Sequence, residues 1–106
     1  MDSILNKLEK ILEERKSASS DLSYVSSLYS KGTSSILDKI SEESEEVINA
    51  VNEEGRKEVI HEVADLWFHL LVLLRHENIQ IEEIEAELAR RFGVSGHDEK
   101  ASRKNS

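Results

Sequence analysis

The chain has 106 residues, enough for one domain with a modest core, and it has no cysteine, which excludes disulfides and thiolate metal sites. Its 22 acidic residues outnumber the 14 lysines and arginines, and the net charge of -8 argues against nucleic acid as the main partner. No apolar run approaches the roughly 20 residues of a membrane span, so we expect a soluble, cytoplasmic protein. The absence of proline, with four glycines and abundant glutamate, lysine and leucine, predicts an all-α fold.

The first predicted helix spans residues 3 to 16. Its apolar residues recur at the helical period: Ile4, Leu5, Leu8, Ile11 and Leu12. Asp2 and Ser3 precede them as possible N-caps. After a polar break, Asp21 is expected to cap a short helix that ends at Gly32.

A long amphipathic helix is predicted over residues 36 to 51, with Thr33 or Ser34 as its cap and Gly55 closing it. On a wheel at about 100° per residue, four apolar residues fall within roughly 60°. They are Ile36, Ile40, Val47 and Val51. Acids follow on one flank of this stripe: Glu42, Glu43 and Glu46. Glu45 falls on the opposite side, so we expect it to face solvent.

A second long helix is predicted after Gly55, with its end near residues 76 to 78. Its buried stripe is expected to consist of Val59, Val63, Leu66, Leu70 and Leu74. Four polar residues share one flank: Glu58, Glu62, Asp65 and His69. His61 is expected on the other side of the helix from Glu62 and Asp65, and Asn78 is expected to end the helix. The segment after Asp65 is apolar almost all round, so other elements or a second subunit should cover it.

Acids that border such an apolar segment are costly to bury unless a cation or hydrogen-bond donors accompany them. Few lysines or arginines lie nearby in the sequence, and a divalent metal ion would compensate for the charge. Oxygen ligands without cysteine favour Mg2+ or Mn2+ over zinc, and Mg2+ indicates phosphate chemistry. The alternative is a pair of solvated acidic faces, because acids at helical spacing are common in this composition. Two such groups on adjacent helices favour the metal.

The acidic motifs resemble those of a known superfamily. Glu42-Glu43-xx-Glu46 and Glu62-xx-Asp65 are similar to the EExxE and ExxD motifs of the all-α, MazG-type nucleotide pyrophosphohydrolases. Within it, the chain resembles the phosphoribosyl-ATP pyrophosphatases over nearly its whole length. The segments that carry this similarity are ERK at 14 to 16, SYVSSLYSKG at 23 to 32, ADLWFHLLVLL at 64 to 74, ELARRFG at 87 to 93 and EKASR at 99 to 103. The resemblance implies a MazG-like bundle of four to five helices completed by dimerisation.

The acids suggest a catalytic mechanism. One or more Mg2+ ions, or Mn2+, would be held by four carboxylates: Glu43, Glu46, Glu62 and Asp65. The metal would bridge the phosphates and stabilise charge on a pyrophosphate leaving group, with water as the nucleophile. Glu42, if it is not itself a ligand, is the candidate to orient or deprotonate that water. The resemblance implies that phosphoribosyl-ATP is cleaved between its α and β phosphates to phosphoribosyl-AMP and pyrophosphate, a step of histidine biosynthesis.

Five further side chains are candidates for substrate binding: Lys31, Lys39, His69, Lys100 and Arg103. Lys39 either neutralises the neighbouring acids without a metal or binds substrate phosphates beside it. Lys31 binds phosphate or is an exposed loop lysine. His69 either hydrogen-bonds a liganding carboxylate or a phosphate, or is a satisfied core histidine. Lys100 and Arg103 either fold over the phosphates or belong to a disordered terminus.

The end of the chain divides into a last helix and a tail. The helix is outlined by Ile81, Ile84, Leu88 and Phe92, and Gly93 is expected to stop it. We therefore expect a pyrophosphohydrolase domain over residues 1 to 93 and a flexible, basic tail over residues 94 to 106.

The second long helix also carries apolar residues outside its stripe. Phe68 and Val72 face away from Leu66 and Leu70, and four or five short helices cannot readily enclose both faces. We therefore expect a homodimer, or a higher homo-oligomer, in which these helices pair across a symmetry axis. Two rival functions stay open: a house-cleaning nucleoside triphosphate pyrophosphohydrolase and a non-catalytic helical dimer with acidic flanks.

Overall fold

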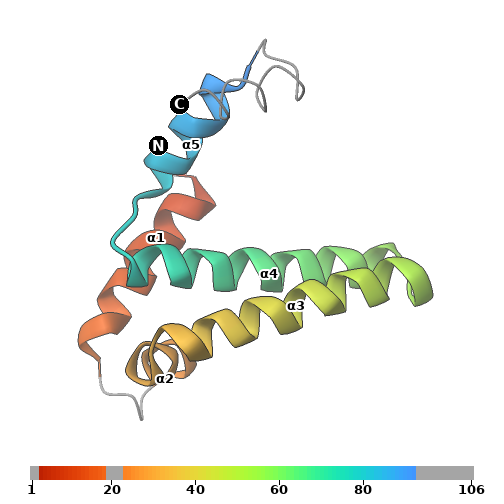
Figure 1. Cartoon of the computed structure of the whole chain (residues 1–106), viewed down its shortest axis with the longest axis horizontal. Coiled ribbons are helices and arrows are strands. Elements are labelled where there is room, and N and C mark those ends of the chain that lie inside the picture. Colours follow the sequence, from red (N-terminus) through yellow and green to blue (C-terminus); the bar gives the residue numbers. More distant parts are fainter. Residues whose placement is uncertain (1–2, 19–22, 93–106) are drawn as a thin grey trace, which may run out of the picture.

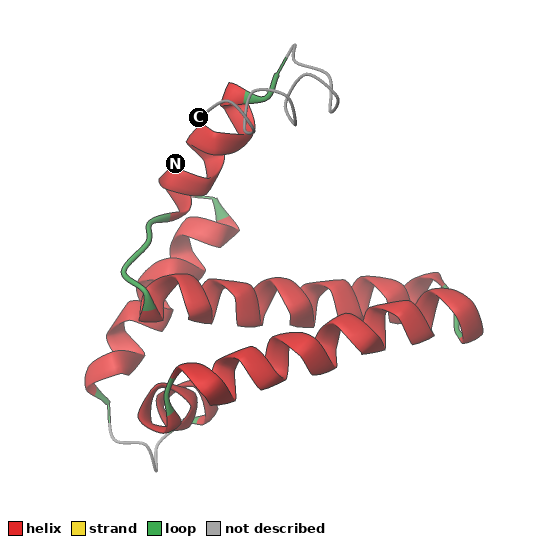
Figure 2. Cartoon of the chain, viewed as in Figure 1, coloured by secondary structure: helices red, strands yellow, loops and turns green. Residues whose placement is uncertain are grey.

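The computed structural model describes residues 3–18 and 23–92, and every regular element in these two segments is helical (Figures 1 and 2). The α-helices are α1 (Ile4–Glu14), α2 (Tyr24–Lys31), α3 (Thr33–Glu53), α4 (Arg56–His76) and α5 (Ile81–Arg90). A 3-10 turn, η1, follows α1 at Arg15–Ser17. The all-α prediction is confirmed. Among the described helices, none combines the length and the apolar character needed to cross a membrane.

The two long helices form an arm. α3 and α4 run antiparallel and lie side by side, joined by a tight turn at Glu54 and Gly55 (Figure 1). The other helices gather at the end of the arm away from that turn: α2 packs on α3, α1 on α4, and α5 on α1. The half of the arm nearer the turn is therefore a two-helix structure within the described part of the chain.

The hydrophobic core lies where the five helices meet. Its buried residues are Leu12, Val25, Leu28, Ile36, Leu71, Val72 and Ile81. Three of them, Leu12, Ile36 and Val72, are at most 1% exposed, and full burial of each such side chain contributes about 1.5–3 kcal/mol. The core fixes one end of the arm, and the acids of both long helices lie beyond it along the arm.

Capping explains where the first two helices begin. Ser3 caps α1, as expected, because its hydroxyl accepts a hydrogen bond from the Asn6 N–H at 3.2 Å. Asp21 lies outside the described residues, and the prediction that it caps α2 is wrong. Ser23 takes that role, with its hydroxyl accepting from the Ser26 N–H at 3.0 Å.

Two other helix ends depend on unusual backbone angles. The prediction that Thr33 or Ser34 caps α3 is wrong, because Gly32 stands at that position without a side-chain cap. Gly32 has φ 94°, a conformation that favours glycine, and its N–H bonds the Leu28 carbonyl to close α2. Asn78 has φ 59° and lies just beyond the end of α4, which confirms its predicted role.

The buried face of α4 differs from the predicted one. Val72 is fully buried and Phe68 packs against the core, whereas Leu70 is 39% exposed and Trp67 is 54% exposed. The reason is that α1 and α2 contact α4 on the side of Phe68 and Val72, which sequence periodicity cannot show. Val51 of α3, predicted to belong to the buried stripe, is 62% exposed because it lies near the end of the two-helix arm.

A buried arginine links α1, the end of α4 and the segment before α5. Arg75 is 5% exposed, and its Nη1 donates to Glu13 Oε1 at 3.0 Å. Its Nη2 lies 3.4 Å from Glu9 Oε2 and also donates to the Ile79 carbonyl. Glu9 in turn accepts from the Ile81 N–H at 2.8 Å, so one network holds the start of α5 against α1.

We expect Arg75→Met to lower the free energy of unfolding by about 3–5 kcal/mol, because it leaves Glu9 and the Ile79 carbonyl without their buried cation. Urea unfolding followed by circular dichroism measures this change. The matched control is Arg90→Met, which breaks an exposed ion pair with Glu87 and should cost less than about 1 kcal/mol. Similar losses in both variants would contradict a structural role for the Arg75 network.

Candidate metal and phosphate site

The predicted acids come from both helices of the arm. Because α3 and α4 run antiparallel from the turn, residues equally far from it lie opposite each other, which places Glu43 and Glu46 across from Glu62 and Asp65. Glu43 is only 8% exposed and Glu46 is exposed, while Glu62 and Asp65 are half-buried. Glu42 lies beside Glu43 on α3 and is exposed. The structure thus brings acids of two helices to one side of the arm.

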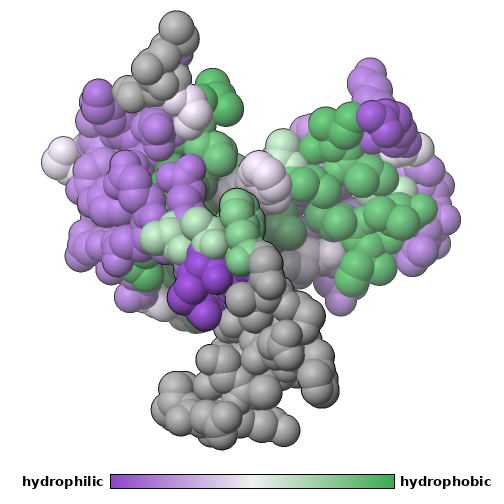
Figure 3. Space-filling model, turned by 90° about the horizontal axis from the view of Figure 1, so that it is seen from above, coloured by the Kyte–Doolittle hydropathy of each residue, from purple (hydrophilic) through white to green (hydrophobic). Residues whose placement is uncertain are grey.

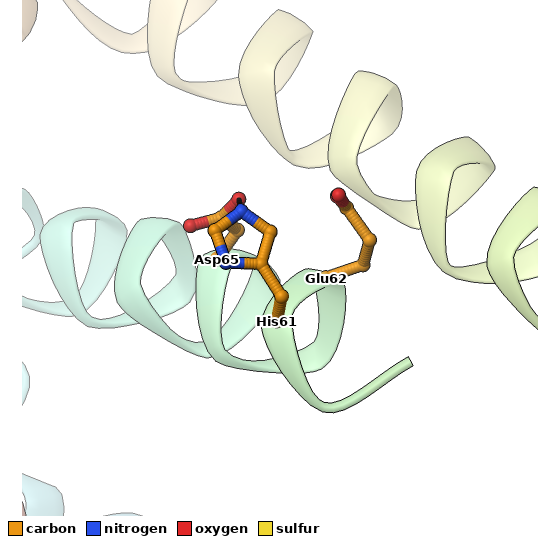
Figure 4. Close-up of side chains that lie close together, drawn as sticks. All are labelled: His61, Glu62 and Asp65. Carbon is orange, nitrogen blue, oxygen red and sulfur yellow. Dashed lines mark ion pairs between the residues drawn. The ribbon is translucent and has the colours of Figure 1, made fainter. Parts of the chain in front are cut away.

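On α4, three side chains form a group that could hold a metal ion. One ligand atom each of His61, Glu62 and Asp65 lies within 4.8 Å of the others, and the Glu62 carboxylate points toward α3 (Figure 4). Glu43 and Glu46 are not members of this group. His61 Nε2 lies 3.4 Å from Asp65 Oδ2, so the prediction that His61 faces the other side of its helix is wrong. Residues four apart in a helix are neighbours on its surface.

Acids of α3 raise the pKa of Glu62 on α4. Burial raises the pKa of this carboxyl, and the positive charge that His61 carries when protonated opposes the increase. Asp65 from the same helix, and Glu46 and Glu43 from α3, raise the pKa further. The acids of the two helices therefore repel one another across the arm. A divalent ion between them would remove this repulsion, and the carboxylate oxygens are the ligands that Mg2+ and Mn2+ prefer.

Lys39 compensates for part of this charge. Its Nζ lies 3.3 Å from Glu42 Oε1 and 3.7 Å from Glu43 Oε1, so the buried Glu43 has a cation partner on its own helix. Burial acts to lower the pKa of Lys39, but the hydrogen bond with Glu42 and the negative charges nearby raise it overall. Lys39 therefore takes the neutralising role, and its contact with substrate phosphates stays a prediction.

His69 is held on both ring nitrogens. It is 5% exposed, and Nδ1 lies 2.7 Å from the main-chain carbonyl of Asp65. A carbonyl only accepts, so Nδ1 carries the proton and Nε2 accepts from the Tyr24 hydroxyl at 2.7 Å. This is the arrangement of a satisfied core histidine, and it supports the turn of α4 that carries Asp65.

Sequence reasoning did not single out Tyr24, although it lies in the segment at 23 to 32 that carries part of the resemblance. Its place beside the site follows from the contact between α2 and α4, which only the fold reveals. The spacing of His61 to Asp65, four residues, was a signal that could have identified that pair. Lys31 is exposed in the last turn of α2. Lys100 and Arg103 lie outside the described residues.

The chain is similar to proteins of one kind over nearly all of its length. The family model described as phosphoribosyl-ATP pyrophosphohydrolase matches residues 5–92. A protein named phosphoribosyl-ATP pyrophosphatase from Vesicomyosocius okutanii subsp. Calyptogena okutanii (strain HA) is 63% identical over 105 residues, covering 99% of this chain and 100% of the relative. The protein of that name from Ruthia magnifica subsp. Calyptogena magnifica is 59% identical over the same shares. The one from Azoarcus sp. (strain BH72) is 49% identical, over 96% of this chain and 95% of its own.

In the absence of metal, Glu62→Gln should leave the protein at least as stable at pH 7, because it removes a carboxylate that its neighbours repel. The direction of this effect follows from the raised pKa of Glu62 in the folded protein. The protonated carboxyl contributes stability at pH values below its ordinary pKa of 4.5, and this contribution is lost as the pH rises through the raised pKa. Adding Mg2+ at about 100 times its Kd should stabilise the wild type by about 2.7 kcal/mol, and Glu62→Gln should lose most of this gain.

Thermal unfolding with and without Mg2+ measures both effects. Glu45→Gln is the matched control, since it removes an exposed carboxylate elsewhere on α3 and should keep the full Mg2+ response. An equal response to Mg2+ in Glu62→Gln and Glu45→Gln would show that ion binding, if any, does not use the acids between the two helices.

Proposed function

The chain belongs to the phosphoribosyl-ATP pyrophosphohydrolase family, and from that membership we propose that it hydrolyses phosphoribosyl-ATP to phosphoribosyl-AMP and pyrophosphate. The observation that carries this proposal is the 63% identity, over 99% of the chain, to a protein named phosphoribosyl-ATP pyrophosphatase. The acids between α3 and α4 supply a suitable site for polyphosphate chemistry. The reaction belongs to histidine biosynthesis, and we place the protein in the cytoplasm, with which its lack of cysteine is compatible.

Mg2+, or alternatively Mn2+, is the cofactor that this donor set fits. Glu62 and Asp65, with Glu43 and Glu46 across the arm, would hold one or more ions. When bound, such an ion supplies positive charge that screens the phosphates and stabilises the pyrophosphate leaving group. The four carboxylates would hold that charge between the two packed helices.

Two neighbouring side chains on α3 act on water and phosphate. Glu42 is exposed beside Glu43, and its carboxylate, which pairs with Lys39, is the group that would orient or deprotonate the attacking water. Lys39 contacts Glu42 at 3.3 Å and is half-buried, so its ammonium group lies at the edge of the acids and can exchange a carboxylate contact for a phosphate oxygen. Three further phosphate ligands in this proposal are Lys31, in the last turn of α2, Lys100 and Arg103.

A second copy of the chain completes the fold in this proposal. The Cα radius of gyration, 16.3 Å, exceeds the roughly 13 Å typical of a compact domain of this length. Apolar side chains gather on the lobe formed by the arm, beside a hollow that separates it from a mostly hydrophilic lobe (Figure 3). Along α4 and α5, exposed apolar residues border a groove of about 230 Å³: Trp67, Leu70, Ile84 and Leu88. Patches of this kind mark interfaces, and a homodimer would bury it.

Pyrophosphate release tests the proposed activity. With Mg2+, the wild type should hydrolyse phosphoribosyl-ATP far faster than ATP or deoxynucleoside triphosphates. Glu43→Gln and Asp65→Asn should each lower kcat/KM by about 100- to 1,000-fold, because they remove fixed charge that stabilises the transition state.

Circular dichroism checks that the helices remain, and Glu45→Gln serves as the control with near wild-type turnover. A preference for common nucleotides would instead indicate a house-cleaning enzyme. No release from any substrate would indicate a non-catalytic helical dimer, and full activity in either variant would remove that residue from the site.

The dimer is tested by placing a charge on the exposed apolar surface. Trp67→Asp should convert the dimer to a monomer in sedimentation velocity, since a buried unpaired carboxylate is costly at an interface. Leu37→Asp introduces the same charge at an exposed apolar residue of α3 that lies outside the groove, and it should leave the assembly intact. A monomeric wild type, or a dimeric Trp67→Asp protein, would contradict this interface.

A further inference from the structure

A second apolar groove is lined by residues of α1, η1, α2 and α4, with Ser23 before α2. We call it the Tyr24 groove. It has a volume of about 300 Å³ and is lined by Leu8, Ile11, Leu12 and Arg15, by Ser23, Tyr24 and Val25, and by Phe68. Two of its walls remain open to solvent, since Ile11 is 46% exposed and Tyr24 is 51% exposed. The groove is therefore accessible, aromatic on one side and apolar on most others.

Tyr24 forms the boundary of this groove in a fixed orientation. Its hydroxyl donates to His69 Nε2 at 2.7 Å, and the two rings meet edge to face with centroids 5.7 Å apart. His69 is in turn held by the Asp65 carbonyl at 2.7 Å and by an edge-to-face contact with Phe68. A chain of contacts thus fixes the tyrosine ring relative to the turn of α4 that carries Asp65.

The charges of nearby acids act on the Tyr24 hydroxyl. Burial raises the pKa of Tyr24, and the charge of Lys39 acts against this increase. Glu43 and Glu42 from α3, and Asp65 from α4, raise it further. The Tyr24 hydroxyl bonds His69, which bonds the Asp65 carbonyl, while Tyr24 also lines the groove, so this residue joins the groove to the turn of α4 that carries Asp65. A ligand that spans the tyrosine would meet both surfaces.

A nucleotide has the two parts that these surfaces suit. Its polyphosphate needs cations and charged groups, whereas its base is a flat aromatic ring that packs well on tyrosine and aliphatic side chains. We propose that the Tyr24 groove binds the purine base of the substrate while the phosphates lie at the acids of α3 and α4. This inference rests on the proposed function for the identity of the substrate, and it assigns the base to residues of α1, α2 and α4.

Charged substitutions in the groove test this assignment, because they should change KM much more than kcat. Ile11→Glu and Ile11→Lys should each raise KM for phosphoribosyl-ATP about tenfold or more, because either charged side chain resists the burial that a stacked base requires. The value of kcat should change less than about threefold, since the acids are untouched. Ile4→Glu and Ile4→Lys are matched controls on the same helix, at a residue that is 78% exposed and outside the groove, and they should keep the wild-type KM.

Three results would overturn the inference. One is equal KM values for the Ile11 and Ile4 variants. Another is a raised KM in Ile11→Glu with a lowered KM in Ile11→Lys, which would show a general electrostatic effect on the phosphates. Tyr24→Ala removes the aromatic side chain from the groove and should also raise KM. An unchanged KM in Tyr24→Ala is the third contradicting result. Circular dichroism establishes that each variant is folded, and Tyr24→Ala carries the test if the Ile11 variants are not.

A binding measurement separates this inference from the proposed function. Calorimetry should show that the wild type binds AMP more tightly than ribose 5-phosphate and that Tyr24→Ala loses most of the difference. Hydrolysis of phosphoribosyl-ATP without any preference for AMP would overturn the base site and leave the activity standing. A preference for AMP in a protein that does not hydrolyse phosphoribosyl-ATP would overturn the activity and support the groove.

Discussion

Repulsion among carboxylates across a two-helix interface is the constraint on which the site depends. Glu43 is nearly buried, and Lys39 at 3.7 Å compensates for only part of the charge around it. On the opposing helix the pKa of Glu62 is raised by burial and by acids from both helices. Such an arrangement is unfavourable at neutral pH unless a cation joins it, and we infer that the cost is retained because it prepares the protein to bind a divalent ion and a polyphosphate.

The open shape of the fold bears on substrate access and on the proposed dimer. The core holds only one end of the arm, so the acids beyond it lie on a surface that a substrate can reach. The same lack of a third helix leaves Trp67 and Ile60 exposed on α4, at 54% and 59%. In the proposed dimer these residues would be covered. At the other end of the arm, the hydrogen bonds of Arg75 and Glu9 hold α1 and the start of α5 against the end of α4.

Much of the fold was predictable from sequence, because it depends on local periodicity and capping. The helices, the Ser3 cap, the left-handed Asn78 and the placement of acids on both long helices follow from spacing along single helices.

The features that were missed depend on tertiary contacts. Phe68 and Val72 are covered because α1 and α2 approach from their side, and Tyr24 meets His69 through the packing of α2 on α4. Arg75 is buried and bonds Glu13, which lies 62 residues away in the chain, so no local pattern predicts the contact. The predicted side of the helix for His61 was wrong, although its four-residue spacing to Asp65 puts the two side chains next to each other on α4.

The central claim is that the acids of α3 and α4 share a divalent ion, and anomalous X-ray scattering from crystals grown with Mn2+ tests it most directly. The account predicts a strong anomalous peak between the two helices, at bonding distance from the carboxylates of Glu62 and Asp65 and from at least one carboxylate of α3. A protein that takes up no Mn2+ there at saturating concentration, or that binds it only at unrelated surface acids, would contradict the account.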